Sequence, residues 1–310
     1  MQHVAAATLA AGVTAGLLSG ACNAVAFLIS RHHATTSPGG GLRLLVLAHL
    51  VMAGACLPLV WLFWPPEGLD VAACLPPLAG VVGCYLAGQA ALIVSLRRAD
   101  ASRVVPLLSL KIVALALIVT CLPETPLDLR QWAAVGLCAV AAALLQGRRD
   151  PVPVAVMALM LAACVGFAAA DLFIVRLIDA VHASAAARPR LWACGLAAAV
   201  TYVSCGAVAA VFLPATTPRS GAAWTAAAWY GLVWLGGMVG LYVCFGLLGV
   251  VFGNVLLSSR GLFAVVIGAA LAHRGWHELE QRVDRATLLR RIAATLLMTA
   301  AIALYVIDVG

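Results

Sequence analysis

Charged residues are scarce in this chain. Asp, Glu, Lys and Arg together make up 10% of its 310 residues, whereas soluble domains contain roughly 25%. Hydrophobic residues make up 64% of the chain. A soluble domain of this length has too little interior to bury that much apolar surface, but a protein surrounded by lipid is apolar on its outside as well. Composition therefore excludes a soluble globular fold and predicts an all-α, multi-pass membrane protein.

Signals for several other classes of protein are also missing. The ten cysteines form no CxxC pair and no Cys/His metal spacing, so we interpret them as small apolar residues within the spans. No P-loop is present, which argues against ATP-driven transport by this chain. The net charge of +7 is divided among short loops without a basic stripe, which argues against nucleic-acid binding. We expect no cofactor and no nucleic-acid partner.

One polar segment has the spacing of a metal site. His273 and His277 are four residues apart, with Glu278 and Glu280 close behind them. On a helix, two histidines at that spacing could share a metal ion. Gly275 weakens a helix there, so we expect no metal site.

Long apolar stretches divide the chain into ten expected membrane spans. A span needs about 20 apolar residues. The first stretch is too long to be the hydrophobic region of a secretory signal peptide. The stretch 222–272 is too long for one helix, and Gly249, Gly253 and Asn254 favour a turn that divides it. The expected spans cover 5–30, 44–64, 71–96, 104–122, 131–147, 153–175, 191–213, two parts of 222–272, and 292–307.

Two segments repeat at a shift of 149 residues without gaps. The stretch Tyr85-Leu-Ala-Gly-Gln-Ala-Ala-Leu-Ile-Val aligns with Trp234-Leu-Gly-Gly-Met-Val-Gly-Leu-Tyr-Val, and Leu107-Leu-Ser-Leu-Lys111 aligns with Leu256-Leu-Ser-Ser-Arg260. We therefore expect two related five-helix halves, 1–150 and 151–310. Because each half has an odd number of spans, the second half enters the membrane inverted. Inverted repeats are the architecture of many secondary transporters.

Four short motifs stand out along the first half of the chain. The first span carries Ser19-Gly-Ala-Cys-Asn23-Ala-Val-Ala-Phe27, in which small residues precede an Asn. Further on come Ala101-Ser-Arg-Val-Val-Pro106, Pro123-Glu124 and Trp132-Ala-Ala-Val-Gly136. In these motifs the chain resembles the EamA-like, ten-helix branch of the drug/metabolite transporter superfamily. They are similar, in order, to the family's first helix, the passage between its third and fourth helices, its Gly-Glu-Arg motif and its glycine-containing fifth helix.

Two departures from the family pattern are visible. Val255 stands where the family has a proline, and the longer segment from His273 to Glu280 replaces the second Glu motif. The resemblance implies a carrier for small polar metabolites, driven by an electrochemical gradient or by exchange, without a bound cofactor. We expect a multi-pass protein of the bacterial inner membrane.

Two cations lie within the expected spans. Lys111, the only lysine in the chain, and Arg260 occupy equivalent positions of the repeat. A cation near the bilayer centre costs roughly 2.5–3.5 kcal/mol on insertion scales and usually faces a polar cavity. Two interpretations stay open. The cations form a site for an anionic or carboxylate-bearing substrate, or each is paired with an internal acid or extends to the membrane interface.

Other polar residues fall inside the spans. Asp171 is a proton-coupling candidate, with an internal salt bridge as the alternative. Asn23 and Gln89 are candidates for orienting a polar substrate, or for tying helices together by hydrogen bonds. Tyr85 and Trp234 are candidates for lining the cavity, against aromatic packing or a place in the interfacial belt.

We therefore expect a secondary active transporter that moves a small polar, anionic or carboxylate-bearing metabolite by alternating access. Its partners would be that small molecule and the lipid bilayer, with the protein a monomer or a homodimer. The alternatives are a membrane-embedded lipid-modifying enzyme and a non-transporting scaffold. Thirteen arginines fall in odd-numbered loops and four in even-numbered loops. This bias favours both termini outside the cytoplasm, whereas the family resemblance favours both inside.

Overall fold

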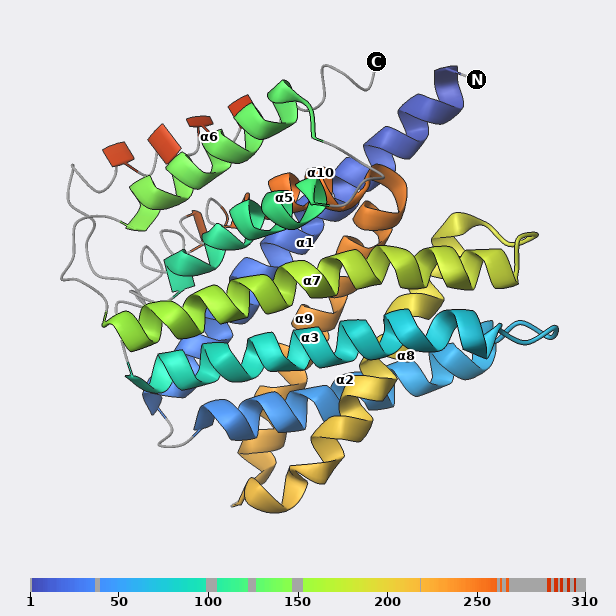
Figure 1. The fold of residues 1–310 in the computed structure, drawn as a ribbon. Helices are drawn as coiled ribbons and strands as arrows, with labels where there is room; N and C mark the ends of the chain where they lie inside the picture. The colour runs from blue at the N-terminus through green and yellow to red at the C-terminus, as the bar shows by residue number, and fades with distance from the viewer. Residues whose placement is uncertain are drawn as a thin grey trace. The chain divides into compact units, whose positions relative to one another are not determined.

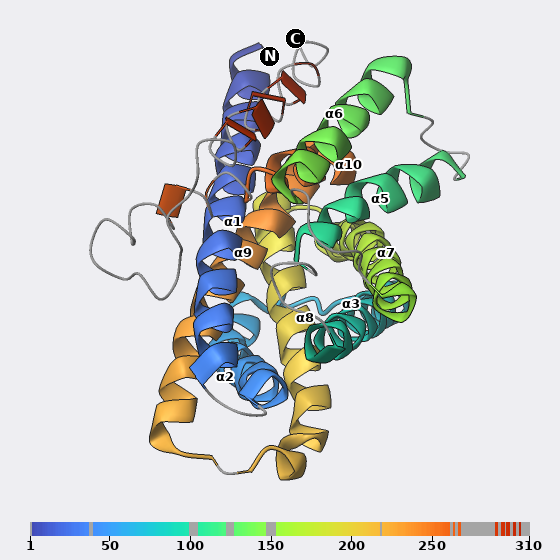
Figure 2. The same ribbon diagram turned by 90° about the vertical axis from the view of Figure 1, so that its left-hand side faces the viewer.

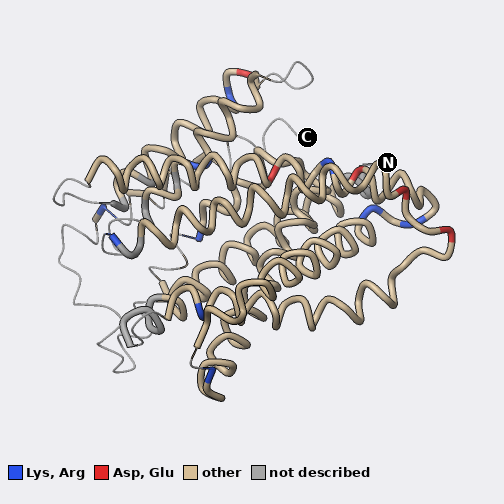
Figure 3. Tube along the Cα trace, turned by 60° about the horizontal axis from the view of Figure 1, so that its bottom comes forward, with Lys and Arg blue, Asp and Glu red and all other residues tan. Residues whose placement is uncertain are grey.

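The computed structural model describes residues 2–36, 40–98, 105–121, 127–146, 153–217 and 219–260, together with scattered positions between 263 and 304. Every regular element within these residues is helical (Figure 1). This agrees with the all-α class that composition predicts. Figure 3 shows long stretches of helix without any charged residue.

The chain divides into two compact units, and each unit combines segments from both halves of the sequence. Unit 1 is residues 1–83 and 171–250, and unit 2 is residues 84–170 and 251–310. Two long helices, α3 (Val71–Arg98) and α7 (Val154–Ser184), contribute one part to each unit. Unit 1 also contains α1 (Gln2–Thr36), α2 (Gly40–Phe63), α8 (Arg190–Val211), η2 (Leu213–Ala215) and α9 (Gly221–Leu248). Unit 2 also contains the 3-10 helix η1 (Val105–Leu110), α5 (Lys111–Thr120), α6 (Leu129–Gln146) and α10 (Val250–Leu257) from its second residue.

Six helices are long and apolar enough to cross a membrane, so the chain is a multi-pass integral membrane protein. They are Ala6–Ser30, Gly40–Phe63, Val71–Ser95, Val154–Ser184, Arg190–Val211 and Gly221–Leu248. These segments correspond to expected spans. The main difference is α7, which continues to Ser184 although the hydropathy pattern predicts an end near residue 175.

The four other expected spans have different outcomes. The stretch 104–122 is not one α-helix, because η1 precedes the ten-residue α5. The stretch 131–147 corresponds to α6, with 18 residues. The expected turn inside 222–272 is confirmed, since α9 ends at Gly249, whose φ of 82° favours glycine. The expected spans around 261–272 and 292–307 lie largely outside the described residues, as do Pro123-Glu124 and the segment from His273 to Glu280.

Small residues hold the helices of unit 1 close together. A Cβ atom added to Gly240 of α9 would lie 2.8 Å from the Ala15 carbonyl oxygen of α1. One added to Gly206 of α8 would lie 3.0 Å from the His49 carbonyl oxygen of α2. Figure 2 shows α1 running beside α9. Close backbone approach through small residues is typical of membrane helix packing.

Candidate functional site

Lys111 lies in unit 2, at the point where the 3-10 helix η1 becomes the α-helix α5. It is the first residue of α5, it is buried, and no acidic residue occupies the first turn of that helix. Changes from 3-10 to α geometry disturb the regular backbone hydrogen bonds. The Cys164 thiol of α7 supplies hydrogen-bond partners at this change of geometry. It donates to the Leu107 carbonyl oxygen at 3.4 Å and contacts the Lys111 backbone N–H.

Arg260 follows a second break in the chain. Helix α10 ends at Leu257, Ser258 and Ser259 form a turn, and the backbone is helical again at Arg260. The Phe263 amide donates to the Ser259 carbonyl oxygen at 3.1 Å, which makes Ser259 the N-cap of the renewed helix. The sequence repeat aligns Lys111 with Arg260, and each cation is the first residue after such a break.

Lys111 and Arg260 both interact electrostatically with the thiol of one residue, Cys164. The Arg260 guanidinium also donates from Nη2 to the Leu108 carbonyl oxygen of η1, at 3.5 Å. Unit 2 therefore contains a group of interacting residues, Lys111, Arg260 and Cys164, which we call the cation cluster.

Along α7, the cation cluster lies away from the helix ends. Cys164 is ten residues from the start of α7, or about 15 Å along the helix axis. Cys138, which lies beside Ser258, is nine residues from the start of α6.

Tyr85 and Gln89, also in unit 2, form a second polar group on α3. The Gln89 amide donates from Nε2 to the Tyr85 hydroxyl at 3.3 Å, and both residues are buried. The Tyr85 ring packs against Phe167 of α7, with 6.2 Å between ring centroids. The expected cavity-lining Tyr85 therefore contacts the expected substrate-orienting Gln89.

The remaining predicted residues lie in unit 1. Asn23 is buried and donates from Nδ2 to the Ser19 carbonyl oxygen at 2.9 Å, within its own helix. Trp234 donates from Nε1 to the Tyr202 hydroxyl at 3.3 Å and packs edge-on against Phe27. Asp171 is buried, close enough to Tyr242 for an electrostatic interaction.

Sequence reasoning missed the polar pair Thr201 and Tyr202 in α8. The Tyr242 hydroxyl donates to Thr201 Oγ1 at 3.0 Å, and Thr201 donates in turn to the Ala197 carbonyl oxygen. The His49 ring stacks on Tyr202 with 6.5 Å between centroids. A Thr-Tyr dipeptide in the middle of the apolar span 191–213 was the signal that could have indicated this buried network.

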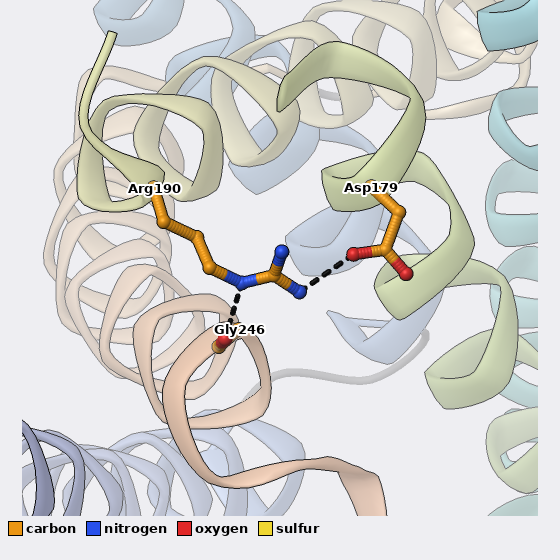
Figure 4. A network of polar contacts seen from close by, with 3 residues as sticks. All are labelled: Asp179, Arg190 and Gly246. Carbon is orange, nitrogen blue, oxygen red and sulfur yellow. Dashed lines mark hydrogen bonds and ion pairs between the residues drawn. The ribbon is translucent and has the colours of Figure 1, made fainter. Parts of the chain in front are cut away.

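An ion-pair network joins three helices at one end of unit 1 (Figure 4). The Arg190 guanidinium donates from Nη2 to Asp179 of α7, and from Nε to the Gly246 carbonyl oxygen of α9, at 2.6 Å in each case. The Arg190 and Asp179 side chains are 37% and 53% exposed, so water screens the pair. The bond to Gly246 fixes the last turn of α9, directly before the break at Gly249.

No metal site is found in the described part of the chain. No three His, Cys, Asp or Glu residues there lie close enough together to hold an ion. The predicted functional residues fall into two sets, with Lys111, Arg260, Tyr85 and Gln89 in unit 2, and Asn23, Asp171 and Trp234 in unit 1.

Comparison with known proteins gives the fold but no family. No family model matches the sequence, and no curated protein matches it either. A solved structure described only as "Crystal structure of protein" aligns over 97% of this chain and 97% of its own, with a TM-score of 0.68. The two sequences are 16% identical, so the likeness concerns the fold alone.

Proposed function

We propose that this protein is a secondary active transporter that moves a small polar, anionic or carboxylate-bearing metabolite by alternating access. We further propose ten spans in two inverted five-helix repeats, as in the EamA-like branch of the drug/metabolite transporters.

Two equivalent helix contacts are the observation that carries the proposal. In unit 1, Gly237 of α9 packs against the Ser19 carbonyl oxygen and Asn23 of α1. In unit 2, Gly88 of α3 packs against the Ala163 carbonyl oxygen and Phe167 of α7. A shift of 149 relates the glycines, and a shift of 144 relates both pairs of partners.

The residues between these partners follow the same register. An added Cβ on Gly237 would lie 3.0 Å from the Cys22 Cβ, and one on Gly166 would lie 3.2 Å from the Gly88 Cα. Cys22 and Gly166 are again 144 residues apart. Direct sequence comparison instead suggests a shift of 148 for these helices, which differs by about one helical turn. The packing register pairs Asn23 with Phe167, and Phe27 with Asp171.

The matching helix contacts in the two units support a transport function for a physical reason. In a carrier built from two inverted repeats, the repeats can exchange conformations. This gives two related states of similar energy, each open to a different side of the membrane, around a fixed site near the midplane. Interrupted helices are typical of such sites, and the helical backbone is interrupted directly before Lys111 and Arg260. Buried polar residues are costly in lipid and generally serve a substrate or ion pathway.

Transport by purified protein in proteoliposomes tests the proposal. Uptake of labelled small metabolites, acids first, is measured with and without an imposed proton gradient and by counterflow. We expect saturable uptake of at least one substrate in vesicles that contain the protein, above that in protein-free vesicles. The absence of saturable uptake and counterflow across the whole panel would contradict the proposed transport function.

A further inference from the structure

We propose that one end of unit 1 lies at the headgroup level of the bilayer and that Arg176 and Arg188 bind the phosphates of phospholipids there. This end consists of the last turns of α2 and α7, the connections that follow them, and the start of α8. We call it the aromatic end. The inference concerns the lipid partner of the protein and does not depend on the proposed transport function.

The first step is that these segments meet at one end of the unit. The Asp70 amide, directly before α3, donates to Ser184 Oγ at the end of α7, at 3.2 Å. This contact brings the connection after α2 next to the end of α7. Arg190, the first residue of α8, bonds Asp179 of α7 and the Gly246 carbonyl oxygen of α9 (Figure 4). The ends of α2, α7 and α9 therefore lie together with the starts of α3 and α8.

The second step is an apolar run that the protein leaves uncovered. The side chains of Trp61, Leu62, Phe63 and Trp64 are between 44% and 84% exposed. Four consecutive large apolar side chains in water would form a patch of the kind that soluble surfaces avoid. Trp rings are instead enriched where lipid hydrocarbon meets the headgroups. The end of α2 therefore marks one face of the hydrocarbon core.

The third step is the length of two helices. Trp192, near the start of α8, and Phe212, at its end, are about 30 Å apart along the helix axis, with no charged residue between them. On α9, Trp224 and Gly246 are about 33 Å apart, again without a charged residue between them. The hydrocarbon core is roughly 30 Å thick. Phe212 and Trp224 are exposed and mark its opposite face.

The fourth step is a pair of arginines with available donors. The Arg188 guanidinium lies over the Trp192 ring and the Arg176 guanidinium over the Phe173 ring, each 5.8 Å from the ring centroid. Both arginines are exposed, and neither guanidinium makes an ion pair or a hydrogen bond in the described part of the chain. A guanidinium stacked on a ring keeps its in-plane N–H groups available, and these match two oxygens of a phosphate.

The acids at the aromatic end do not occupy these arginines. Asp179 pairs with Arg190, and Asp70 accepts from the Ala73 amide at the start of α3, at 3.1 Å. Glu67 is exposed and makes no ion pair among the described residues. Inorganic phosphate has the same charge as a headgroup phosphate. The exposed apolar run beside the arginines favours a phosphate attached to acyl chains.

The same level accounts for the length of α7. Asp179 lies level with Arg190, so the turn from 180 to 184 extends beyond the hydrocarbon core. Hydropathy predicts an end near residue 175 because the helix leaves the apolar region there, although the helix itself continues to Ser184. Arg176 lies about 4.5 Å before Asp179 along the axis, and its long side chain can extend to the headgroups.

Spin labels test the level of the aromatic end. Leu62→Cys, Leu191→Cys and Gly236→Cys are labelled in a Cys121→Ser background, because Cys121 is the exposed cysteine of the ten. Gly236 is the matched control, an exposed position near the middle of α9 where an added Cβ meets nothing within 4 Å. In vesicles of phosphatidylcholine and phosphatidylglycerol, depth is read from collisions with oxygen and with a water-soluble nickel chelate. We expect the labels at 62 and 191 to lie roughly 15 Å shallower than the label at 236, which is half the hydrocarbon thickness.

Lipid binding tests the two arginines. The purified full-length protein in detergent is titrated with phosphatidylglycerol, with a galactolipid that lacks phosphate, and with inorganic phosphate, at constant ionic strength. Binding is read from thermal stabilisation. We expect phosphatidylglycerol to bind more tightly than the galactolipid, and inorganic phosphate alone to give no stabilisation.

Variants assign the binding to the arginines. Arg176→Gln and Arg188→Gln should each weaken phosphatidylglycerol binding roughly fivefold, the contribution of one basic residue at a lipid surface. Arg188→Lys keeps the charge but loses the fork-shaped donor, so it should retain part of the affinity. Glu67→Gln is the matched control, because it changes an exposed charge at the same end without removing a phosphate donor, and it should leave the affinity unchanged.

Several outcomes would overturn the inference. Labels at 62 and 191 as deep as the label at 236 would contradict the level, and labels shielded from both reagents would show that protein covers the aromatic end. Equal binding of phosphatidylglycerol and the galactolipid, or equal stabilisation by inorganic phosphate, would contradict lipid phosphate as the ligand. Unchanged phosphatidylglycerol binding by a variant that combines Arg176→Gln and Arg188→Gln would exclude the arginines. The wild-type comparisons stand even if a variant does not fold.

Discussion

The guanidinium of Arg260 donates from Nη2 to the carbonyl oxygen of Leu108, 3.5 Å away and 152 positions earlier in the chain. This contact ties the helix break before Arg260 to the 3-10 helix η1 before Lys111, inside unit 2. Arg260 therefore has a structural contact as well as a candidate role in substrate binding, and substitutions at this position have to separate the two.

Neutralising Lys111 or Arg260 should strongly reduce transport. We expect Lys111→Gln and Arg260→Gln to reduce substrate uptake by at least roughly tenfold, the effect of losing one charge-assisted hydrogen bond. Arg260→Lys keeps the charge but loses the fork-shaped donor geometry, so it should retain partial uptake. Uptake into proteoliposomes is measured alongside size-exclusion profiles. Full transport by well-folded Lys111→Gln and Arg260→Gln would rule out the proposed role of the pair.

Asp171 should couple transport to protons. Asp171→Asn cannot release or bind a proton, so uptake by this variant should no longer depend on external pH or on an imposed proton gradient. The measurement is uptake across a pH series, with Asp179→Asn as the matched control, because Asp179 lies on the same helix at an exposed position. A pH profile shared by Asp171→Asn and the wild type would exclude the relay.

The glycine contact between α1 and α9 should be sensitive to a single methyl group. A Cβ at Gly240 would lie 2.8 Å from the Ala15 carbonyl oxygen, whereas one at Gly236, a turn earlier on α9, would meet nothing within 4 Å. Gly240→Ala should therefore lower stability by about 1–3 kcal/mol through overpacking. Gly236→Ala should be neutral or slightly stabilising because alanine favours helix. Thermal denaturation in detergent compares the two variants, and equal stabilities would contradict the close approach of the two backbones at Gly240.

The contact between Arg190 and the Gly246 carbonyl oxygen should contribute more to stability than the ion pair between Arg190 and Asp179. Arg190→Ala removes both the ion pair and the bond to the Gly246 carbonyl oxygen, while Asp179→Ala removes only the exposed pair. A double-mutant cycle should give a coupling energy of about 0.2–1 kcal/mol for the pair. The rest of the stability lost in Arg190→Ala would come from losing the hydrogen bond to the Gly246 carbonyl oxygen, near the end of α9. Equal destabilisation by the two single variants would show that the Gly246 contact contributes nothing.

Much of the local structure follows from the sequence. The apolar stretches predict six long helices because hydrocarbon thickness sets their length, and Gly249 marks the end of α9 because that residue adopts a positive φ. The end of α7 at Ser184 was less predictable. Its last turns carry polar residues such as Asp179 and His182, which a hydropathy pattern treats as loop but which backbone hydrogen bonds keep helical.

The sequence by itself determined that this is a membrane protein and which residues are polar within its apolar segments. Tertiary structure alone decided that Lys111 and Arg260 both interact electrostatically with Cys164, that Ser259 is buried, and that Thr201 accepts a hydrogen bond from Tyr242. The physical reason is periodicity. Hydropathy reports that a helix is surrounded by apolar groups, but in lipid every face is apolar, so the pattern carries little information about which faces meet. Close contacts between small residues fix those faces, and they depend on the partner helix.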